Sequence, residues 1–179
     1  GHMEAVGYDL YCKMLNEAVQ TLKGVETVPD FSTTVELDVD AFIPPSYIVN
    51  EQQKLDIYKR IAGVETARES EEMKEELLDR FGAVPESVDN LVRIALIRTR
   101  AHRLYITELK GRPGSLRFFY RPDAKVHGEN IPALLAAHGG KLKFSHQGTP
   151  EFTYQWNPKE GLQEGLLSLT ERILDDMSR

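Results

Sequence analysis

The spacing of apolar residues changes near the middle of the chain, and this change limits the fold more than any other feature. Up to about residue 103, apolar residues recur every three or four positions, as in amphipathic helices. From residue 106 they alternate with polar residues, which is typical of half-buried strands. The pattern predicts an α+β domain, with a helical first half packed with a small antiparallel sheet and closed by a C-terminal helix.

Helix-end signals divide the first half into three segments. Asn50 with Gln53, and Thr66 with Glu69, have the spacing of a capping box, in which a side chain binds the free N–H groups of the first turn. Gly82 stands where the second helix is expected to end. The third helix follows Pro85 and is apolar on more than one side, so we expect it to be central.

Strand and turn signals dominate the second half. Alternating residues predict one early strand and two later hairpins, at residues 35–39, 106–110, 116–120, 142–144 and 152–156. The first hairpin is expected to turn at residues 111–114 (GRPG). A short helix is expected between Asn130 and Gly139, and Asn157 followed by Pro158 predicts the start of the last helix.

The first 31 residues differ in pattern from the rest. Gly1 and His2 resemble the remnant of a cleaved affinity tag. Residues 11–22 carry one apolar stripe on a predicted helix, whereas residues 24–33 lack a period and indicate a linker. We therefore expect a tag remnant, a helix and a linker in residues 1–31, and one domain in residues 32–179.

Composition excludes several classes of protein. Hydrophobic residues make up 41% of the chain and charged residues 28%, which is typical of a globular protein. A net charge of −6 disfavours autonomous binding to nucleic acid or to an anionic membrane. No apolar run reaches the roughly 18 residues of a membrane span. Cys12 is the single cysteine, so no intramolecular disulfide is expected, and a reducing cytoplasm fits.

The sequence contains no catalytic motif. Four histidines beyond the first residues are scattered and lack metal-ligand spacing: His102, His127, His138 and His146. The sequence Gly139-Gly140-Lys141 follows a predicted helix instead of opening one, so it does not predict a nucleotide site. We expect no catalytic residue, metal or cofactor. An enzyme with a site assembled by the fold ranks last, and a pocket that gathers His or Cys with carboxylates would indicate it.

Arginines around the first hairpin leave a second function open. Arg117 and Arg121 alternate with Phe119 along one predicted strand. Arginines between aromatic residues can stack nucleic-acid bases, which would make this an accessory nucleic-acid-contacting domain. The other interpretation is that the arginines balance carboxylates on neighbouring elements, and it agrees better with the acidic composition.

The segment EEMKEELLDRFG, residues 71–82, concentrates negative charge on one predicted helix. At about 100° per residue, one broad stripe of this helix contains Glu69, Glu72, Glu76 and Asp79. Carboxylates on the exposed side lack the apolar pocket that separates the pKa values of a catalytic pair. The stripe is therefore either a solvated face or a docking surface, and composition alone favours the solvated face.

Three collinear stretches of the chain resemble one protein family. They are GYDLYCKMLNEAV (7–19), VELDVDAFIPPSYIVNEQQKLDIYKRIA (35–62) and EELLDRFGAVPESVDNLVRIA (75–95). The most specific pattern is Ile-Pro-x-x-Tyr-Ile, then Tyr-Lys-Arg-Ile, then Leu-x-Asp-Arg-Phe-Gly-x-x-Pro. Together the stretches are similar to the C-terminal part of the bacterial transcription-repair coupling factor (Mfd) family.

That resemblance implies a role for the chain. In the family, the full protein is a DNA translocase that removes stalled RNA polymerase from lesions and recruits the excision-repair protein UvrA, and its ATP site lies upstream of this region. The C-terminal domain is implied to be regulatory and non-catalytic. It docks on the N-terminal UvrA-binding module of the same protein, masks that module and restrains the motor. The predicted first helix would descend from the end of the motor.

The resemblance also assigns docking residues. In the family, charged residues of the Asp-Arg-Phe-Gly helix contact basic side chains of the N-terminal module. The motif places these residues at Glu76, Asp79 and Arg80. Glu72 is added from helical geometry alone. UvrA and RNA polymerase are expected as indirect partners through the full protein, and no membrane partner is expected.

Overall fold

The computed structural model describes residues 31–124 and 128–179, so the predicted first helix and Cys12 lie outside the described residues. The described chain divides into two compact units. Unit 1 includes Val39–Thr99, and unit 2 consists of Thr33–Asp38 and Arg100–Arg179. The sequence pattern did not predict this division. Each unit is described by itself.

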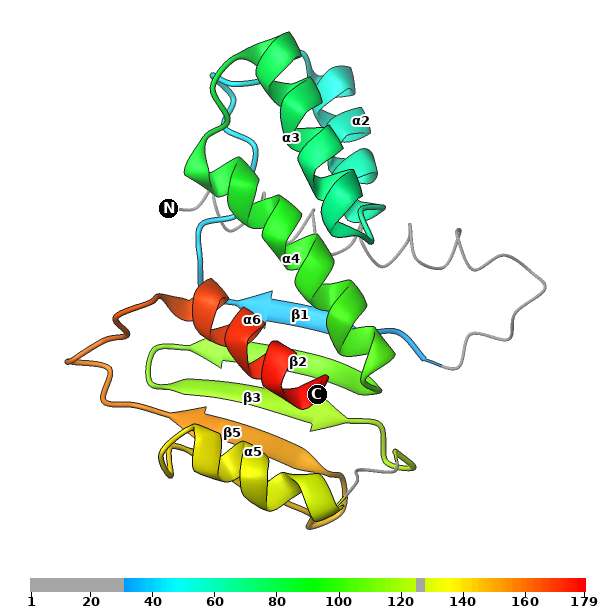
Figure 1. Ribbon diagram of the computed structural model, residues 1–179. Helices are drawn as coiled ribbons and strands as arrows, with labels where there is room; N and C mark the ends of the chain where they lie inside the picture. Colours follow the sequence, from blue (N-terminus) through cyan, green and yellow to red (C-terminus); the bar gives the residue numbers. More distant parts are fainter. Residues whose placement is uncertain (1–30, 125–127) are drawn as a thin grey trace. The chain divides into compact units, whose positions relative to one another are not determined.

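Unit 1 is built from helices α2 (Glu51–Ala62), α3 (Ala67–Phe81) and α4 (Glu86–Arg103), the last of which continues into unit 2 beyond Thr99. The helices α2 and α3 lie side by side, with their ends joined by a short turn (Figure 1). Their apolar faces form a core with the first part of α4, as the periodicity predicts. The core side chains include Ile57, Ile61, Met73, Leu77, Leu91 and Ile94.

Both predicted N-cap residues form the expected side-chain contacts. The backbone N–H of Gln53 donates to Asn50 Oδ1 at 2.9 Å, and that of Glu69 donates to Thr66 Oγ1 at 3.1 Å. These bonds satisfy N–H groups that the first turn of each helix leaves open. Helix α3 ends at Gly82, whose φ of 91° is accessible to glycine and unfavourable for other residues.

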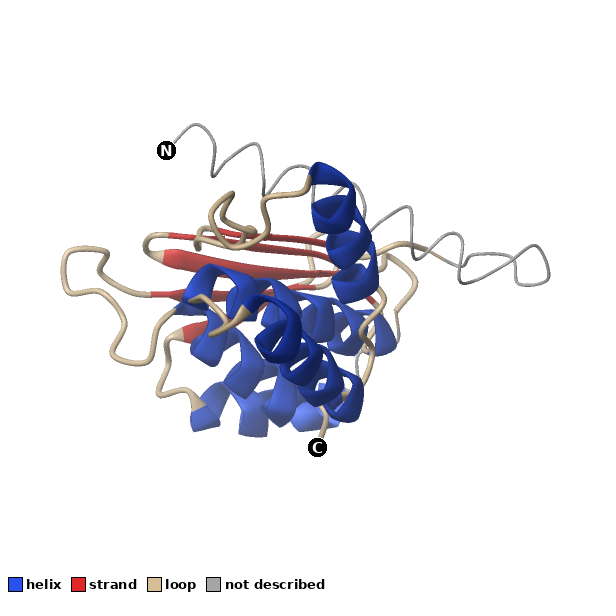
Figure 2. Ribbon diagram, turned by 90° about the horizontal axis from the view of Figure 1, so that it is seen from above, coloured by secondary structure: helices blue, strands red, loops and turns tan. Residues whose placement is uncertain are grey.

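Unit 2 contains a five-stranded sheet in the order β1-β2-β3-β5-β4 (Figure 1). The strands are β1 (Thr34–Leu37), β2 (Ile106–Arg112), β3 (Ser115–Tyr120), β4 (Leu142–Ser145) and β5 (Glu151–Gln155). They form one layer, seen from above in Figure 2. Both predicted hairpins are confirmed as antiparallel pairs, whereas β1 pairs with β2 in parallel. The α+β class is therefore confirmed, with one parallel edge strand added to an otherwise antiparallel sheet.

Helices cover one face of this sheet. Helix α6 (Leu166–Met177) lies across it, and α5 (Ile131–Ala137), preceded by the short 3-10 helix η1 (Gly128–Asn130), lies over the end formed by β5 and β4 (Figure 1). The inward side chains of β3 are Leu116, Phe118 and Tyr120, all buried, and they alternate with the outward Arg117 and Phe119. The period of two in the sequence thus marks the core of unit 2.

Two predicted boundaries are wrong. The turn of the first hairpin is shorter than GRPG, because Gly111 and Arg112 belong to β2. A Cβ atom at Gly111 would lie 2.7 Å from Leu37 Cδ2 and 2.9 Å from Leu166 Cδ2, so glycine allows β1 and α6 to approach β2 closely.

The last helix begins at Leu166 and not at Asn157. Asn157 does accept bonds from the next turn, since its carbonyl oxygen receives the N–H groups of Glu160 and Gly161 at 3.1 Å. The turn does not continue as a helix because Gly161 and Gly165 adopt φ values of 71° and 82°. A helix-start signal is therefore present without the helix that it predicts.

Candidate protein-binding surface

The predicted docking residues Glu72, Glu76, Asp79 and Arg80 all lie on α3 of unit 1. The buried residues of α3 are Ser70, Met73 and Leu77, so the charged stripe faces away from the core, as predicted. The structure brings the four residues onto one helix surface but gives them different surroundings. We define these four residues as the α3 face.

Glu76 is not a free carboxylate. Arg60, from α2, binds both of its oxygens, with Nη2 at 2.7 Å from Oε1 and Nη1 on Oε2. Arg80 Nη1 donates to the same Oε2 at 3.0 Å. The hydrogen bonds from Arg60, reinforced by those from Arg80, lower the pKa of Glu76 from 4.5 to about 2. The bond to Arg80 lies within one turn of α3, whereas the sequence did not predict the bond to Arg60.

The other members of the α3 face are more open. Glu72 pairs along its own helix, with Arg68 Nε at 3.2 Å, and both side chains are well exposed. Asp79 is exposed and has no ion-pair partner within residues 31–124 and 128–179. Arg80 stacks its guanidinium 4.9 Å from the centre of the Phe81 ring. Asp79 is therefore the carboxylate of this face that a partner could bind without displacing an existing bond.

The lowered pKa of Glu76 predicts a pH dependence. The folded-state pKa of about 2 lies below the ordinary 4.5, so the pairing stabilises the fold above about pH 4.5 and this contribution disappears as the pH falls towards 2. Because the side chain is 35% exposed, we expect solvent screening to keep the contribution below about 1 kcal/mol. Carbon-13 NMR of the Glu76 carboxyl group measures the titration directly.

The matched variants are Arg60→Gln and Arg68→Gln. The first removes the bidentate partner, so the pKa of Glu76 should rise towards its ordinary value. The second removes an arginine that pairs with Glu72 instead, so the titration of Glu76 should not move. A midpoint near 4.5 in the unmodified chain would show that the pairing does not persist in solution.

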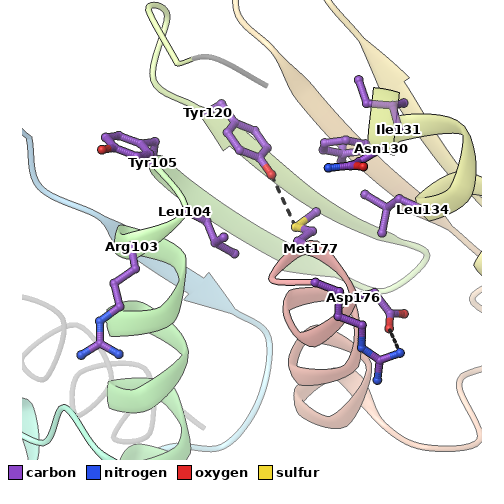
Figure 3. Close-up of a pocket in the computed structure, with 11 residues that line it drawn as sticks. Arg103, Leu104, Tyr105, Tyr120, Asn130, Ile131, Leu134, Asp176 and Met177 are labelled. Carbon is purple, nitrogen blue, oxygen red and sulfur yellow. Dashed lines mark hydrogen bonds and ion pairs between the residues drawn. The ribbon is translucent and has the colours of Figure 1, made fainter. Parts of the chain in front are cut away.

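A pocket of about 260 Å³ in unit 2 tests the enzyme hypothesis (Figure 3). It is lined by side chains from the end of α4, from β3 and β5, and from α5 and α6, without any histidine or cysteine. Tyr120 points its hydroxyl at Met177 Sδ, 3.6 Å away, and burial raises the pKa of Tyr120 to about 12. Asp176, also in the lining, lies 3.9 Å from Arg179 Nη1. This lining contains no acid–base pair suited to catalysis at neutral pH.

His138 comes closest to a catalytic arrangement, and it is closed to substrate. Its side chain is fully buried, with Nε2 at 2.9 Å from Asp176 Oδ2 and Nδ1 at 3.3 Å from Arg172 Nη1. Because an arginine can only donate, Nδ1 accepts the bond from Arg172, whereas Nε2 lies close to Asp176 without forming a hydrogen bond. These contacts hold the residue that follows α5 against α6. Nothing in the sequence near His138 indicates these partners, because Arg172 and Asp176 are distant in the chain.

Two arginines on or next to the first hairpin, Arg117 and Arg121, are engaged by carboxylates. Arg117 Nε lies 2.7 Å from Glu151 Oε1, and its hydrogen bond lowers the pKa of Glu151. The same guanidinium lies 4.7 Å from the centre of the Phe119 ring. Arg121 Nε lies 2.7 Å from Asp123 Oδ1. These contacts favour charge balance over base stacking, so the nucleic-acid alternative gains no support from the described residues.

Two further findings concern absent features. Within residues 31–124 and 128–179, no group of three or more His, Cys, Asp or Glu could hold a metal ion. None of the described helices is long and apolar enough to cross a membrane.

Comparison with known proteins identifies the family. The model of the TRCF domain family matches residues 37–131, just over half of the chain. This match includes α2, α3 and α4, and therefore the whole α3 face. The chain belongs to the TRCF domain family.

Curated relatives and a solved structure agree with this family. The transcription-repair-coupling factor of Bacillus subtilis is 30% identical over 187 residues, covering 97% of this chain and 16% of the relative. That of Escherichia coli K12 is 39% identical over 116 residues, covering 62% of this chain and 10% of the relative. The chain thus spans a small part of these relatives.

The fold is that of a solved domain. A crystal structure of the C-terminal domain of transcription-repair coupling factor matches with a TM-score of 0.66 at 21% sequence identity. The match covers 83% of this chain and 92% of the solved one.

Proposed function

We propose that this chain is the non-catalytic regulatory C-terminal domain of a transcription-repair coupling factor, a DNA-repair translocase of the bacterial cytoplasm. In this proposal it docks through the α3 face on the N-terminal UvrA-binding module of the same protein. Docking masks the UvrA-binding surface and restrains the motor, whose ATP site lies outside this chain. UvrA and RNA polymerase are then partners of the full protein.

The observation that supports this role is the exposed, unpaired charge of Asp79 beside Arg80, within the family-matched region. Contacts within the described residues account for Glu76, His138 and Arg117. Asp79 has no such role among the described residues. A carboxylate held outward by a rigid helix suits electrostatic recognition of a basic surface, which contributes orientation and specificity more than affinity.

A weak contact is sufficient for such a mechanism. The two modules belong to one chain, so their effective concentration is high and docking need not bury a large interface. A partner can then displace the contact when it binds the open state better than the closed state. Salt should weaken the docking because the charges are exposed.

The test is the Asp79→Lys variant of the full-length protein. Reversing this charge should weaken docking and increase the affinity for UvrA at least tenfold, because the masking contact is lost. The stability of the isolated 179-residue chain should change by less than about 0.5 kcal/mol, since Asp79 is exposed and unpaired. Titration calorimetry with UvrA measures the first quantity and urea unfolding the second.

The matched control is Glu160→Lys, which makes the same charge change at an exposed residue outside the α3 face. It should leave UvrA affinity unchanged. If Asp79→Lys binds UvrA no more tightly than the unmodified protein, the proposed function is incorrect.

A further inference from the structure

A groove between α2 and α3 lies beside the α3 face. Its volume is about 450 Å³, and it is lined by Gln53, Asp56, Ile57, Lys59, Arg60 and Arg80. Three of these side chains are cations and one is a carboxylate. The groove is therefore locally positive on a chain whose net charge is −6.

The groove already holds one carboxylate, which is that of Glu76. The guanidinium of Arg60 meets it with two parallel N–H donors, and that of Arg80 adds a third. This fork geometry is the form in which arginine recognises carboxylates. Each guanidinium has five N–H donors, so both arginines retain donors that Glu76 does not use.

Exposure keeps these donors accessible. The side chains of Arg60 and Arg80 are 48% and 41% exposed, and Lys59 is exposed without an ion-pair partner in the part of the chain that the structure describes. The three cations of the groove face two carboxylates, Asp56 of the lining and Glu76, so the set keeps a net positive charge. A further carboxylate placed beside Arg60, Arg80 and Lys59 would be attracted.

We propose that this groove binds an aspartate or glutamate side chain of the docking partner. The inference rests on the proposed function and extends it, because the docking face then has two poles. Asp79 attracts a cation of the partner, while the groove beside it binds an anion. Glu76 competes with the partner's carboxylate for the donors of the two arginines.

A docking face with one anionic part, Asp79, and one cationic part, the groove, fixes the orientation of the partner. A partner that carries an arginine and a carboxylate at matching positions satisfies both, whereas a reversed or uniformly basic surface places a cation against Arg60 and Lys59. Like charges placed together at an interface are unfavourable, so the wrong orientation is rejected. A nucleic-acid backbone fits poorly, because it offers no cation to Asp79 and brings successive phosphates towards that carboxylate.

The groove can be tested on the 179-residue chain alone. The probe is an acetylated, amidated tetraglutamate peptide, and the signals followed by NMR are the Nε–H groups of Arg60 and Arg80. Tetraglutamate should shift both signals, and tetralysine should shift neither. Absence of a shift with tetraglutamate overturns the proposal, as does a larger shift with an oligothymidylate of equal charge.

Two substitutions sharpen this test. Lys59→Glu should weaken tetraglutamate binding at least fivefold without unfolding the chain, because Lys59 is exposed and unpaired among the described residues. Glu76→Gln should strengthen it at least threefold, because the competing internal carboxylate is removed. Equal binding by Lys59→Glu, or weaker binding by Glu76→Gln, contradicts the proposal.

Measuring how tightly the variants dock to the N-terminal module distinguishes failure of this inference from failure of the proposed function on which it rests. We expect both Asp79→Lys and Lys59→Glu to weaken docking at least fivefold. If only Asp79→Lys does so, the function stands and the anion-binding groove is rejected. If Asp79→Lys has no effect while tetraglutamate still binds at Arg60 and Arg80, the docking function is rejected and the groove keeps its carboxylate ligand.

Discussion

Replacing Phe118 by alanine is expected to lower the free energy of unfolding by about 3–5 kcal/mol. Phe118 is fully buried at the centre of the sheet, paired with Leu109 of β2 and with Phe152 of β5. Removing the ring leaves a cavity between three strands and the helices that cover them, and strands can close such a cavity only partly. Urea unfolding followed by Trp156, the single tryptophan, reports on unit 2.

The control is the next residue of the same strand. Phe119→Ala removes the same ring from the outward face, where Phe119 is partly exposed and contacts Arg117. Its expected loss is below about 1.5 kcal/mol. Comparable losses for the two variants would contradict the inward and outward alternation of β3.

Leu77→Ala is expected to destabilise unit 1 by about 2–5 kcal/mol. Leu77 is fully buried on α3, on the side opposite the charged stripe. Its neighbour Leu78 is 54% exposed, so Leu78→Ala should cost less than about 1 kcal/mol. Residue-resolved hydrogen exchange on α2 and α3 measures both effects.

This pair of variants also tests whether docking depends on a rigid α3. Leu77→Ala changes no charge, so any loss of docking at temperatures where unit 1 stays folded would have to come through the helix backbone. We expect docking at low temperature to be retained within about threefold, because the charged groups are unchanged. If Leu77→Ala lost as much docking affinity as Asp79→Lys, the exact position of α3, and not the charge of its side chains, would dominate the contact.

The elements that the sequence predicts well are those that local rules determine. The capping pairs Asn50–Gln53 and Thr66–Glu69 lie within one helical turn, and the alternation of β3 needs only its own residues. Their neighbours in space are also neighbours in the chain, so periodicity and propensity suffice.

Features that depend on distant residues were not predicted. The parallel pairing of β1 with β2 joins Val35 to Leu109, and nothing in the sequence near Val35 indicates that partner. Asn157 shows the opposite error. It starts a turn as the local signal predicts, but Gly161 and Gly165, which have positive φ, prevent the turn from continuing as a helix. The division into two units also depends on contacts between distant segments.

The candidate site follows the same rule. The position of Asp79 and Glu72 on the outer side of α3 follows from helical geometry, and the structure confirms their exposure. The pairing of Glu76 with Arg60 could not be predicted, because sixteen residues separate them and the contact requires α2 and α3 to be packed. Arg60 was visible only as part of the Tyr-Lys-Arg-Ile motif, with no role attached.

The parallel pairing of β1 with β2 has a consequence for any attempt to divide this protein. The chain leaves the sheet after β1, forms three helices, and returns at Ile106, so Val39–Thr99 is inserted between the two segments of unit 2. A fragment beginning at Arg100 would lack β1 and would expose the unpaired backbone of β2. Such an exposed strand edge can pair with other chains and cause aggregation. Pairing β1 with β2 closes a loop that contains the whole intervening segment, which has a large entropic cost. We therefore expect β1 to be the last strand to join the sheet during folding.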